Sequence, residues 1–547
     1  MKTLRLFLAV FISASGTGNF LFAQCNPPTA QTDLDIANVR ARIMNGADMW
    51  WDAVNQTGPN YEVPFGSGER SWFTVALWIG GLDASNNLHF AAQTYRQDGI
   101  DFWPGPLDSL GCGISPAVSS QFNHLWKINR QDVINFIGGA PATPNMISYP
   151  GNAPDGSRLA PFHDANGDGI YNTADGDYPD FGLNGTSNCC DVLHGDQAIW
   201  WVINDNCSNT PHTETHGTPL GIEIQCQAFA FNTTDADINN TTFYQYKIKN
   251  CSPNIYHSTY FGFFADPDLG NYLDDFVGCD VGRSMGYCYN DTAYPTGYYQ
   301  HPPIVGIDFL HSPISSTGLS MSNFSFFNND FTCTGNPTTA QIAYNYLQTK
   351  DCNNNHYMHL GVPANCMYPY NSDPTGISTG GVPQSPWTEI TEGNIGFDRR
   401  FVMSAGPFTM QPGEVINCIT LAAVWARDTT DPGPYYSLAA LQTADDKIQL
   451  FFDSCYHYGT LGIPPMQNIR ASVYPNPASD VLEVNFGSTL TDGTFTLCDI
   501  VGKTIRQVSV KNKNRISISC KDIASGIYVY RILNAEGKTG SGKVMIK

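Results

Sequence analysis

Apolar and polar residues alternate in many short stretches of this chain. This is the pattern of β-strands that bury one face and expose the other. The clearest stretches before residue 460 are 72–79, 198–203, 221–225, 242–248 and 415–421. Gly, Pro, Asn and Asp stand between them and supply turns. The pattern predicts a mainly β fold, with a large β-rich body built from more than one sheet.

Apolar residues recur at helical spacing in only two convincing segments, 130–137 and 437–454. In the second segment, the residues expected to form one apolar face are Leu438, Leu441, Ile448 and Phe452. Residues 333–387 are rich in Asn, Gly and Pro, and we expect a long loop excursion there. Helices are therefore expected to be a minor part of the fold.

The segment from residue 469 to the C-terminus has a strand pattern of its own. Runs of period two cover 481–484, 495–498, 515–518 and 527–531. Turn signals lie at 492–493, 502–503, 525–526 and 536–537. This spacing predicts a small C-terminal β-sandwich of the immunoglobulin-like kind.

Short motifs give this C-terminal segment a family resemblance. It has Tyr-Pro-Asn-Pro-Ala at 474–478, Asp-x-x-Gly-Lys at 499–503, Ser-Gly-Ile-Tyr at 525–528, and a last strand that ends at Lys547. Residues 469–547 resemble the type A C-terminal sorting domain of the bacterial type IX secretion system. The resemblance implies recognition by the outer-membrane secretion machinery and removal of the tail by a sortase-like peptidase. An ordinary immunoglobulin-like domain is the alternative.

The N-terminus has the pattern of a secretory signal peptide. Lys2 and Arg5 form a short basic region, an apolar stretch follows, and we expect cleavage after Ala23. Acylation of Cys25, as in a lipoprotein, is the alternative, although Gln24 is unfavourable just before an acylated cysteine. No other run is long and apolar enough to cross a bilayer. We therefore expect no transmembrane segment in the mature chain.

These features divide the chain into four parts. We predict a signal peptide at 1–23, a β-rich secreted body at 24–457, a linker rich in Gly and Pro at 458–468, and the sorting domain at 469–547. The body is long enough to contain two subdomains.

Several stretches of the body resemble a set of large secreted proteins that carry the same kind of tail. The stretches include 61–64, 76–83, 102–106, 195–198 and 265–270. This second resemblance implies secretion, but it implies no activity.

Charge is distributed unevenly along the chain. The net charge is −21, whereas the tail from residue 469 holds more Lys and Arg than Asp and Glu. The body is therefore strongly acidic, and we expect it to repel nucleic acid phosphates and to attract divalent cations. The charged fraction is only 14%, which is typical of extracellular β proteins rich in Asn, Thr, Tyr, Gly and Pro.

The sixteen cysteines all follow the signal peptide. An even number in an exported chain predicts disulfides, for example among Cys189, Cys190, Cys207 and Cys226, with the connectivity left open. No pair has CxxC spacing, which disfavours a zinc ribbon. A thiol nucleophile at Cys189 or Cys190 beside His194 is the alternative to a disulfide there.

Residues 164–175 match the spacing of a calcium-binding loop. Such a loop has oxygen ligands at positions 1, 3 and 5, Gly at 6, a backbone carbonyl at 7 and a carboxylate at 12. The matching residues are Asp164, Asn166, Asp168, Gly169, the Ile170 carbonyl and Asp175. Asp175 stands where EF-hands usually have Glu, and amphipathic helices are missing from both flanks. We expect an isolated calcium loop of the extracellular kind; a plain Asn/Asp/Gly turn cluster is the alternative.

A second acidic run offers another candidate site. It consists of Asp266, Asp268, Asp274, Asp275 and Asp280. The alternatives are ion binding, a carboxylate pair for acid/base hydrolysis, and a solvated acidic loop.

The segment His212-Thr-Glu-Thr-His216 is a weaker candidate for a metal site. Alternate residues of a strand lie on one face, so both imidazoles and the Glu214 carboxylate would come together there and suit zinc. A polar strand end explains the same residues.

The sequence favours a secreted or cell-surface cargo protein whose body is a calcium-braced adhesion or ligand-binding module. Exposed aromatic residues stack on sugar rings, so a glycan or another cell-surface ligand is the expected partner, although core packing accounts for most aromatics. HExxH, GxSxG and a Gly-rich phosphate loop are all missing, which disfavours an enzyme. The alternative is an extracellular hydrolase of polysaccharide or protein.

Overall fold

The computed structural model describes most of the chain between residue 24 and the C-terminus. The described ranges are 24–96, 99–108, 111–185, 188–208, 210–291, 301–317, 320–369, 387–430, 437–456, 472–499, 503–534 and 539–547. The predicted signal peptide and the predicted linker at 458–468 lie outside them. The chain divides after Asp453 into two compact units, the body and the tail, which we describe separately.

The body contains two nine-stranded antiparallel sheets, so the predicted mainly β fold is confirmed. The first sheet consists of β1 (Gln31–Leu34), β2 (Arg40–Met44), β3 (Asp48–Met49), β4 (Tyr61–Glu62), β5 (Arg70–Leu82), β6 (Leu88–Ala92), β14 (Tyr256–Pro267), β18 (Asn323–Asn328) and β21 (Arg399–Met410). The second consists of β7 (Trp103–Pro104), β8 (Trp126–Asn129), β11 (Gln197–Asn204), β12 (Ile222–Ala230), β13 (Thr241–Asn250), β15 (Asp275–Asp280), β16 (Met285–Asn290), β17 (Ile304–His311) and β22 (Val415–Ala426). The five predicted strands are β5, β11, β12, β13 and β22.

The main hydrophobic core lies between the two sheets. Alternate residues of the central strands face inward, and they are apolar in both sheets. Tyr246 of β13 and Phe263 of β14 meet there with ring centroids 5.4 Å apart. The indole of Trp50 donates a hydrogen bond to the hydroxyl of Tyr244 across 2.8 Å, so these two aromatic residues are also joined through their polar atoms. One core therefore joins both sheets.

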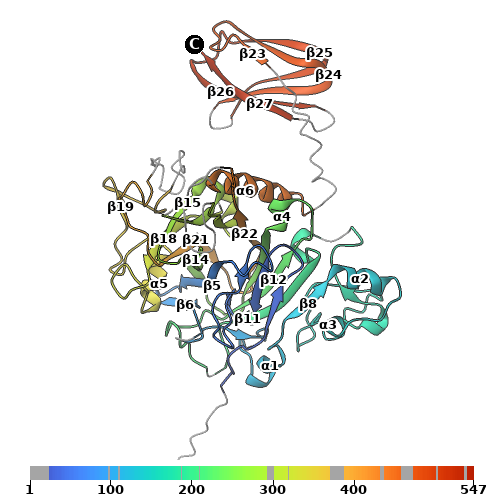
Figure 1. Ribbon diagram of the computed structural model, residues 1–547. Helices are drawn as coiled ribbons and strands as arrows, with labels where there is room; N and C mark the ends of the chain where they lie inside the picture. Colours follow the sequence, from blue (N-terminus) through green and yellow to red (C-terminus); the bar gives the residue numbers. More distant parts are fainter. Residues whose placement is uncertain are drawn as a thin grey trace, which may run out of the picture. The chain divides into compact units, whose positions relative to one another are not determined.

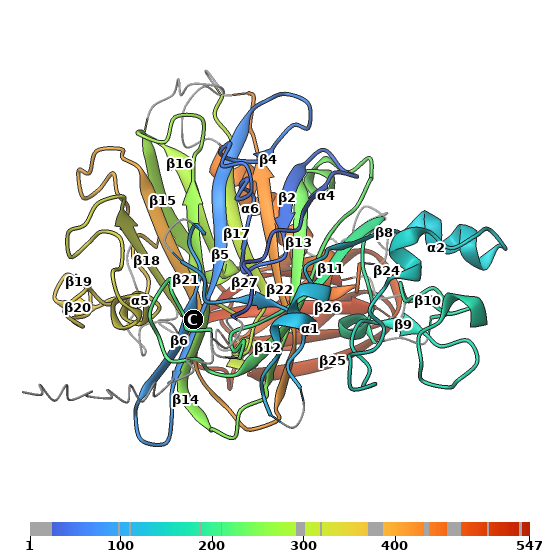
Figure 2. The ribbon, with the colours of Figure 1, turned by 90° about the horizontal axis from the view of Figure 1, so that it is seen from below.

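The outer face of the first sheet carries a second apolar cluster that includes Trp78, Phe264 and Phe327. Helix α5 (Ala340–Tyr346) contributes Tyr346 to this cluster. On the second sheet, α6 (Ser437–Asp453) packs on β17 and β22. The ribbon places α5 and α2 (Arg130–Ile137) at opposite sides of the body (Figure 1 and Figure 2). Helices thus cover part of the outer face of each sheet.

The two predicted helices, α2 and α6, are confirmed, but Phe451 is buried on α6 whereas Phe452 is only partly buried. The segment predicted as a loop from residue 333 contains α5, which begins after the cap residue Thr339. The shorter elements are α1 (Pro116–Gln121), α3 (Pro144–Ile147), α4 (Ala236–Asn239), β9 (Phe162–His163), β10 (Tyr178–Pro179), β19 (Met358–His359) and β20 (Val362–Pro363). The helices α1, α3, α4 and α5 have too few turns to show apolar periodicity in a sequence.

The disulfides differ from the pairing considered from the sequence. Cys190 is bonded to Cys418 and Cys207 to Cys25, whereas Cys226 is a buried free thiol. The remaining bonded cysteines are Cys333, which pairs with Cys352, together with Cys189 and Cys455. The predicted disulfides are therefore confirmed, but the pairing given as an example is wrong, because the fold brings together cysteines that are far apart in the chain. The sulfur of Cys25 is engaged in the disulfide with Cys207.

The tail is an antiparallel five-stranded sheet with its own core. Its strands are β23 (Ser472–Tyr474), β24 (Val481–Asp499), β25 (Thr504–Ser519), β26 (Gly526–Asn534) and β27 (Thr539–Ile546). The predicted turn at Asp492-Gly493 is wrong, because Gly493 lies within β24 and pairs with both Val510 and Asn534. Pairing on both edges keeps this Gly in an extended strand. The predicted β-sandwich character of the tail is confirmed.

Candidate functional site

A cavity of about 670 Å³ opens beside the outer face of the first sheet. We call it the acidic–aromatic pocket, and its main residues are Tyr95, Asp266, Asp268, Tyr272, Phe331, Asp398 and Arg400. It adjoins the outer apolar cluster, because Phe264 and Phe327 belong to both. The pocket therefore combines ionisable groups with an aromatic wall.

Strand pairing places the charged residues of the pocket. In the antiparallel pair of β14 and β21, Ala265 is opposite Phe401, so Asp266 and Arg400 are neighbours across the strands. Asp268 follows β14 directly and Asp398 precedes β21 directly. The two strands thus bring three carboxyl groups and one guanidinium to the same end of the sheet.

Arg400 is held in a fixed position by several partners. Its Nη1 donates hydrogen bonds to Oδ1 of Asn329 at 2.6 Å and Oδ1 of Asn336 at 2.7 Å. Its Nε lies 3.4 Å from Oδ1 of Asp266, and its guanidinium carbon lies 5.4 Å from the ring centroid of Tyr95. A rigid guanidinium of this kind is suited to fixed hydrogen-bond geometry.

Asp266 is a buried carboxyl with strong partners. The hydroxyl of Tyr95 donates a hydrogen bond to its Oδ2. Burial nevertheless raises the pKa of Asp266 to about 6, because desolvation outweighs the opposing effects of Arg400 and Tyr95. Burial and the negative charge of Asp266 also raise the pKa of Tyr95 well above its usual range, so this phenol stays protonated.

Asp268 has a different environment. Burial, reinforced by the charges of Asp266 and Asp398, raises the pKa of its carboxyl to about 8. Arg400 opposes this increase only weakly, and among the described residues no group donates a hydrogen bond to the Asp268 carboxyl. At neutral pH this side chain is therefore mainly a neutral acid that can donate a hydrogen bond into the pocket.

The exposed aromatic rings of the pocket are Tyr272 and Phe331. The side chain of Phe331 is 86% exposed and that of Tyr272 is 48% exposed. All ten tryptophans, in contrast, are buried, which confirms that most of the large aromatic residues serve the core. A ligand in the pocket would therefore stack on these two rings and not on a tryptophan.

The remaining residues of the acidic run lie outside the pocket. Asn290 donates hydrogen bonds to Oδ1 of Asp274 at 2.8 Å and to Oδ1 of Asp275 at 3.4 Å. Asp280 caps a short 3₁₀ turn and pairs with Arg283 at 2.8 Å. Of the five acidic residues expected to share one site, only Asp266 and Asp268 line this pocket.

The residues considered for zinc do not converge. The His212 ring is buried, with Nδ1 3.0 Å from the Phe90 carbonyl oxygen and Nε2 2.7 Å from the Asp205 carbonyl oxygen. Glu214 instead lines the acidic–aromatic pocket, where its Oε1 accepts a hydrogen bond from the Thr94 amide at 3.1 Å. Both ring nitrogens of His212 are occupied, so this histidine has a structural role.

The loop at 164–175 closes on its own backbone. The carboxylate of Asp164 accepts hydrogen bonds from the amides of Gly167 at 2.7 Å and Gly169 at 2.8 Å. The Gly169 amide is the main cause of the lowered pKa of Asp164. Asp168 accepts from the Ile170 amide at 2.7 Å, and Gly167 and Gly169 both have positive φ values.

Two acidic residues at the end of this loop have different surroundings. Asp175 is exposed and accepts a hydrogen bond from the Asn172 side chain at 2.7 Å. Asp177 is buried and accepts from the amides of Ala165 and Asn172 at 2.8 and 2.9 Å, so it ties both ends of the loop together. Asp177 lies outside the twelve positions of the loop pattern, so its role was not expected from the sequence. Within the described ranges, no three His, Cys, Asp or Glu side chains are grouped closely enough to hold a metal ion.

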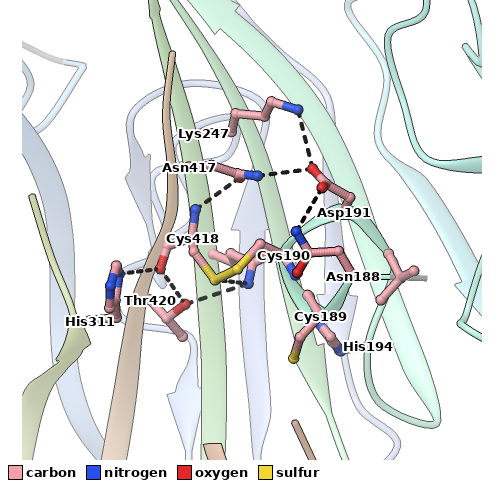
Figure 3. The surroundings of a disulfide bond; sticks show 12 residues. Asn188, Cys189, Cys190, Asp191, His194, Lys247, His311, Asn417, Cys418 and Thr420 are labelled. Carbon is pink, nitrogen blue, oxygen red and sulfur yellow. Dashed lines mark hydrogen bonds and ion pairs between the residues drawn. A yellow bond between two sulfur atoms is a disulfide. The ribbon is translucent and has the colours of Figure 1, made fainter. Parts of the chain in front are cut away.

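A second cavity, of about 560 Å³, lies on the outer face of the second sheet. The Cys190–Cys418 disulfide links one wall to β22, and Asp191 of that wall accepts a hydrogen bond from Asn417 at 2.9 Å (Figure 3). Two side chains at the floor of this cavity are hydrogen-bonded to each other: Gln227 donates to Gln245 at 2.8 Å. These polar groups are already paired, so the acidic–aromatic pocket is the better candidate site.

The fold and the C-terminal motifs define an exported protein with a β-rich body and a sorting tail. Residues 472–547 match the family described as the secretion system C-terminal sorting domain. The chain is thus a cargo protein of the type IX secretion system, and its destination is the cell surface or the medium. Its tail is the part that interacts with the secretion machinery. Among the described helices, none is long and apolar enough to span a membrane.

Several solved structures are similar to parts of the chain. An immunoglobulin-like β-sandwich protein from Bacteroides vulgatus is 16% identical, covering 14% of this chain and 84% of that chain, with a TM-score of 0.13. CopC from Methylosinus trichosporium is 15% identical, covering 14% of this chain and 91% of that chain, with a TM-score of 0.12. A polysaccharide lyase is 9% identical, covering 60% of this chain and 34% of that chain, with a TM-score of 0.19. None of these similarities bears on function, and no curated protein matches the chain.

Proposed function

We propose that the body is a binding module that takes an uncharged glycan in the acidic–aromatic pocket. The observation that carries this proposal is Asp268, a partly buried acid in a cavity, for which no described residue is a hydrogen-bond donor. Burial of such a group lowers the stability of the fold, and no hydrogen bond from a described residue compensates for this loss. Perturbed carboxyl groups of this kind concentrate at functional sites.

The chemistry of the pocket matches a polyhydroxylated ligand. Sugar hydroxyls both donate and accept hydrogen bonds, and the pocket offers the protonated Asp268 as a donor and Asp398 as an acceptor. The exposed rings of Tyr272 and Phe331 supply surfaces on which the apolar face of a sugar stacks. The strongly acidic body repels anionic glycans, which favours uncharged ones.

Retention of the secreted protein on a glycan array tests this proposal. We expect Phe331→Ala and Tyr272→Ala each to weaken binding about tenfold, equivalent to about 1.4 kcal/mol. Phe65 is also well exposed and lies outside the pocket, so Phe65→Ala is the matched control and should bind like the parent. If Phe331→Ala and Tyr272→Ala bind as tightly as the control, the pocket is not the glycan site.

One observation favours hydrolysis as a second candidate function. An acid that remains protonated at neutral pH is what a glycosidase needs as general acid, and Asp266 would be the second carboxyl group. The binding proposal predicts no turnover of polysaccharide, peptide or ester substrates. Hydrolysis that disappears in Asp266→Asn or Asp268→Asn, with folding intact, would contradict the binding proposal and support the catalytic one.

We also propose that the 164–175 loop binds calcium and braces the body. Support comes from the spacing of Asp164, Asn166, Asp168 and Asp175, with the Ile170 carbonyl between them. The left-handed conformation of Gly169 at position 6 is the sharp turn that this type of loop requires.

A further inference from the structure

Two free cysteines of the body, Cys112 and Cys251, lie side by side. Both residues bond to the same backbone carbonyl and pack on the same apolar cluster, although they are far apart in the sequence. Eight of the sixteen cysteines are already disulfide-bonded, as expected for a chain that passes through the oxidising periplasm. Two free thiols in contact are therefore an exception that needs a reason.

One carbonyl group organises this pair. The oxygen of Gly221 accepts a hydrogen bond from the Cys251 amide at 3.0 Å and another from Sγ of Cys112 at 3.3 Å. Gly221 has a φ of +75°, and a Cβ atom there would lie 2.7 Å from Sγ of Cys112. Glycine at this position therefore leaves room for the sulfur of Cys112 beside Cys251.

The backbone also holds Cys112 in place. This residue has a φ of +52°, which is uncommon for a residue with a side chain and persists only where the surroundings enforce it. The carbonyl oxygen of Cys112 accepts a hydrogen bond from Nδ2 of Asn206 at 2.6 Å, and its amide donates to the Asp108 carbonyl at 3.2 Å. The backbone is thus strained at Cys112, and these hydrogen bonds hold the residue in that conformation.

We propose that Cys112 and Cys251 form a disulfide bond in the exported protein. The oxidant is the disulfide of a periplasmic thiol–disulfide oxidoreductase, which the Cys112 thiolate attacks to give a mixed disulfide and one free thiolate of the oxidoreductase. Cys251 then loses its proton and attacks Sγ of Cys112, which releases the second thiolate of the oxidoreductase. One sulfur–sulfur bond forms in the body, two S–H bonds break, and the oxidoreductase leaves as a dithiol.

The two neighbouring thiols differ in acidity. The Cys251 thiol lowers the pKa of Cys112, whereas the Cys112 thiol and burial raise the pKa of Cys251. Cys112 is therefore the more easily ionised nucleophile for the first step. Both side chains are partly exposed, so an oxidant can reach them.

The new bond would reinforce a junction that already has one disulfide. Cys112 and Cys251 pack against an apolar cluster that contains the Cys25–Cys207 pair together with Trp103. A bond from Cys112 to Cys251 would fasten the loop around Gly113 to the end of β13. Two bonds would then hold this junction together, one at Cys25 and one at the loop around Gly113.

Peptide mapping of the secreted wild-type protein tests the proposal directly. Free thiols are alkylated under denaturing, non-reducing conditions, and the protein is cut with trypsin and an aspartate-specific protease. The second protease is needed because Cys251 and Cys279 share a tryptic peptide. We expect a Cys112–Cys251 linked pair, lighter by two hydrogen atoms than the two reduced peptides. The Cys333–Cys352 pair in the same digest is the internal reference.

Two variants test the same disulfide in a second way. Cys112→Ser should leave Cys251 alkylated, whereas Cys226→Ser, which removes a buried free thiol elsewhere, should leave the Cys112–Cys251 link intact. Recovery of both Cys112 and Cys251 as alkylated peptides from wild-type protein, beside an intact reference pair, would overturn the proposal. A link from either residue to a third cysteine would overturn it as well.

Discussion

Replacing Asp268 by Asn should stabilise the body, and the gain should grow with pH. The ordinary pKa of this carboxyl is 3.8, and in the folded protein burial raises it to about 8. Between these values the unfolded chain has lost the proton and the folded chain retains it. The folded state therefore binds the extra proton, so wild-type stability falls as pH rises through this window. Asn does not titrate and is free of this loss.

The size of the effect follows from the proton difference. One proton bound only by the folded state changes the free energy of unfolding by at most about 1.4 kcal/mol per pH unit. Asp268 is only partly buried, so solvent reduces this limit. From pH 5 to pH 7 we expect the advantage of Asp268→Asn over wild type to increase by about 1 to 2 kcal/mol.

Urea denaturation followed by tryptophan fluorescence measures this difference for the body alone, because all ten tryptophans are buried there and the tail has none. Asp83→Asn is the control with the opposite shift: hydrogen bonds led by the Asn87 side chain lower the pKa of Asp83 to about 2. Both states of Asp83 are ionised above pH 5, so the titration of Asp83 itself contributes no change in stability between pH 5 and 7. A constant difference between Asp268→Asn and wild type over this range would refute the argument.

Three further predictions concern export, calcium and a buried ion pair. Deletion of residues 469–547 should leave the body in the periplasm by cell fractionation, and the mature C-terminus of the intact protein should fall between 458 and 471; surface delivery of the truncated chain would contradict this. Calcium at ten times its dissociation constant should stabilise the body by about 1.4 kcal/mol in thermal unfolding, and Asp168→Ala should remove this response; an unchanged response would favour the plain turn. Arg399→Ala should destabilise the body by about 3 to 5 kcal/mol, because the buried carboxylate of Glu389, now 2.7 Å from the Arg399 guanidinium, would lose its partner; urea denaturation that shows no loss would disprove it.

Local sequence patterns determined the strands and the tail. Segments such as 242–248 alternate apolar and polar residues whatever strand they pair with, so their type and inward face can be read without a structure. The motifs of the sorting domain lie within one short segment and are equally local. The turn expected at Asp492-Gly493 failed because pairing on both edges of β24 overrides a local turn preference.

Only the tertiary structure decided which residues share a site. Asp266 and Asp268 are neighbours in sequence, but Arg400 and Glu214 reach their pocket through strand pairing and through a loop from another part of the chain. The same holds for the Cys190–Cys418 bond. Alternation tells which face of a strand is buried, whereas the partner and register of each strand depend on how two whole sheets fill one core. Contacts between distant residues therefore appear only when that core is assembled.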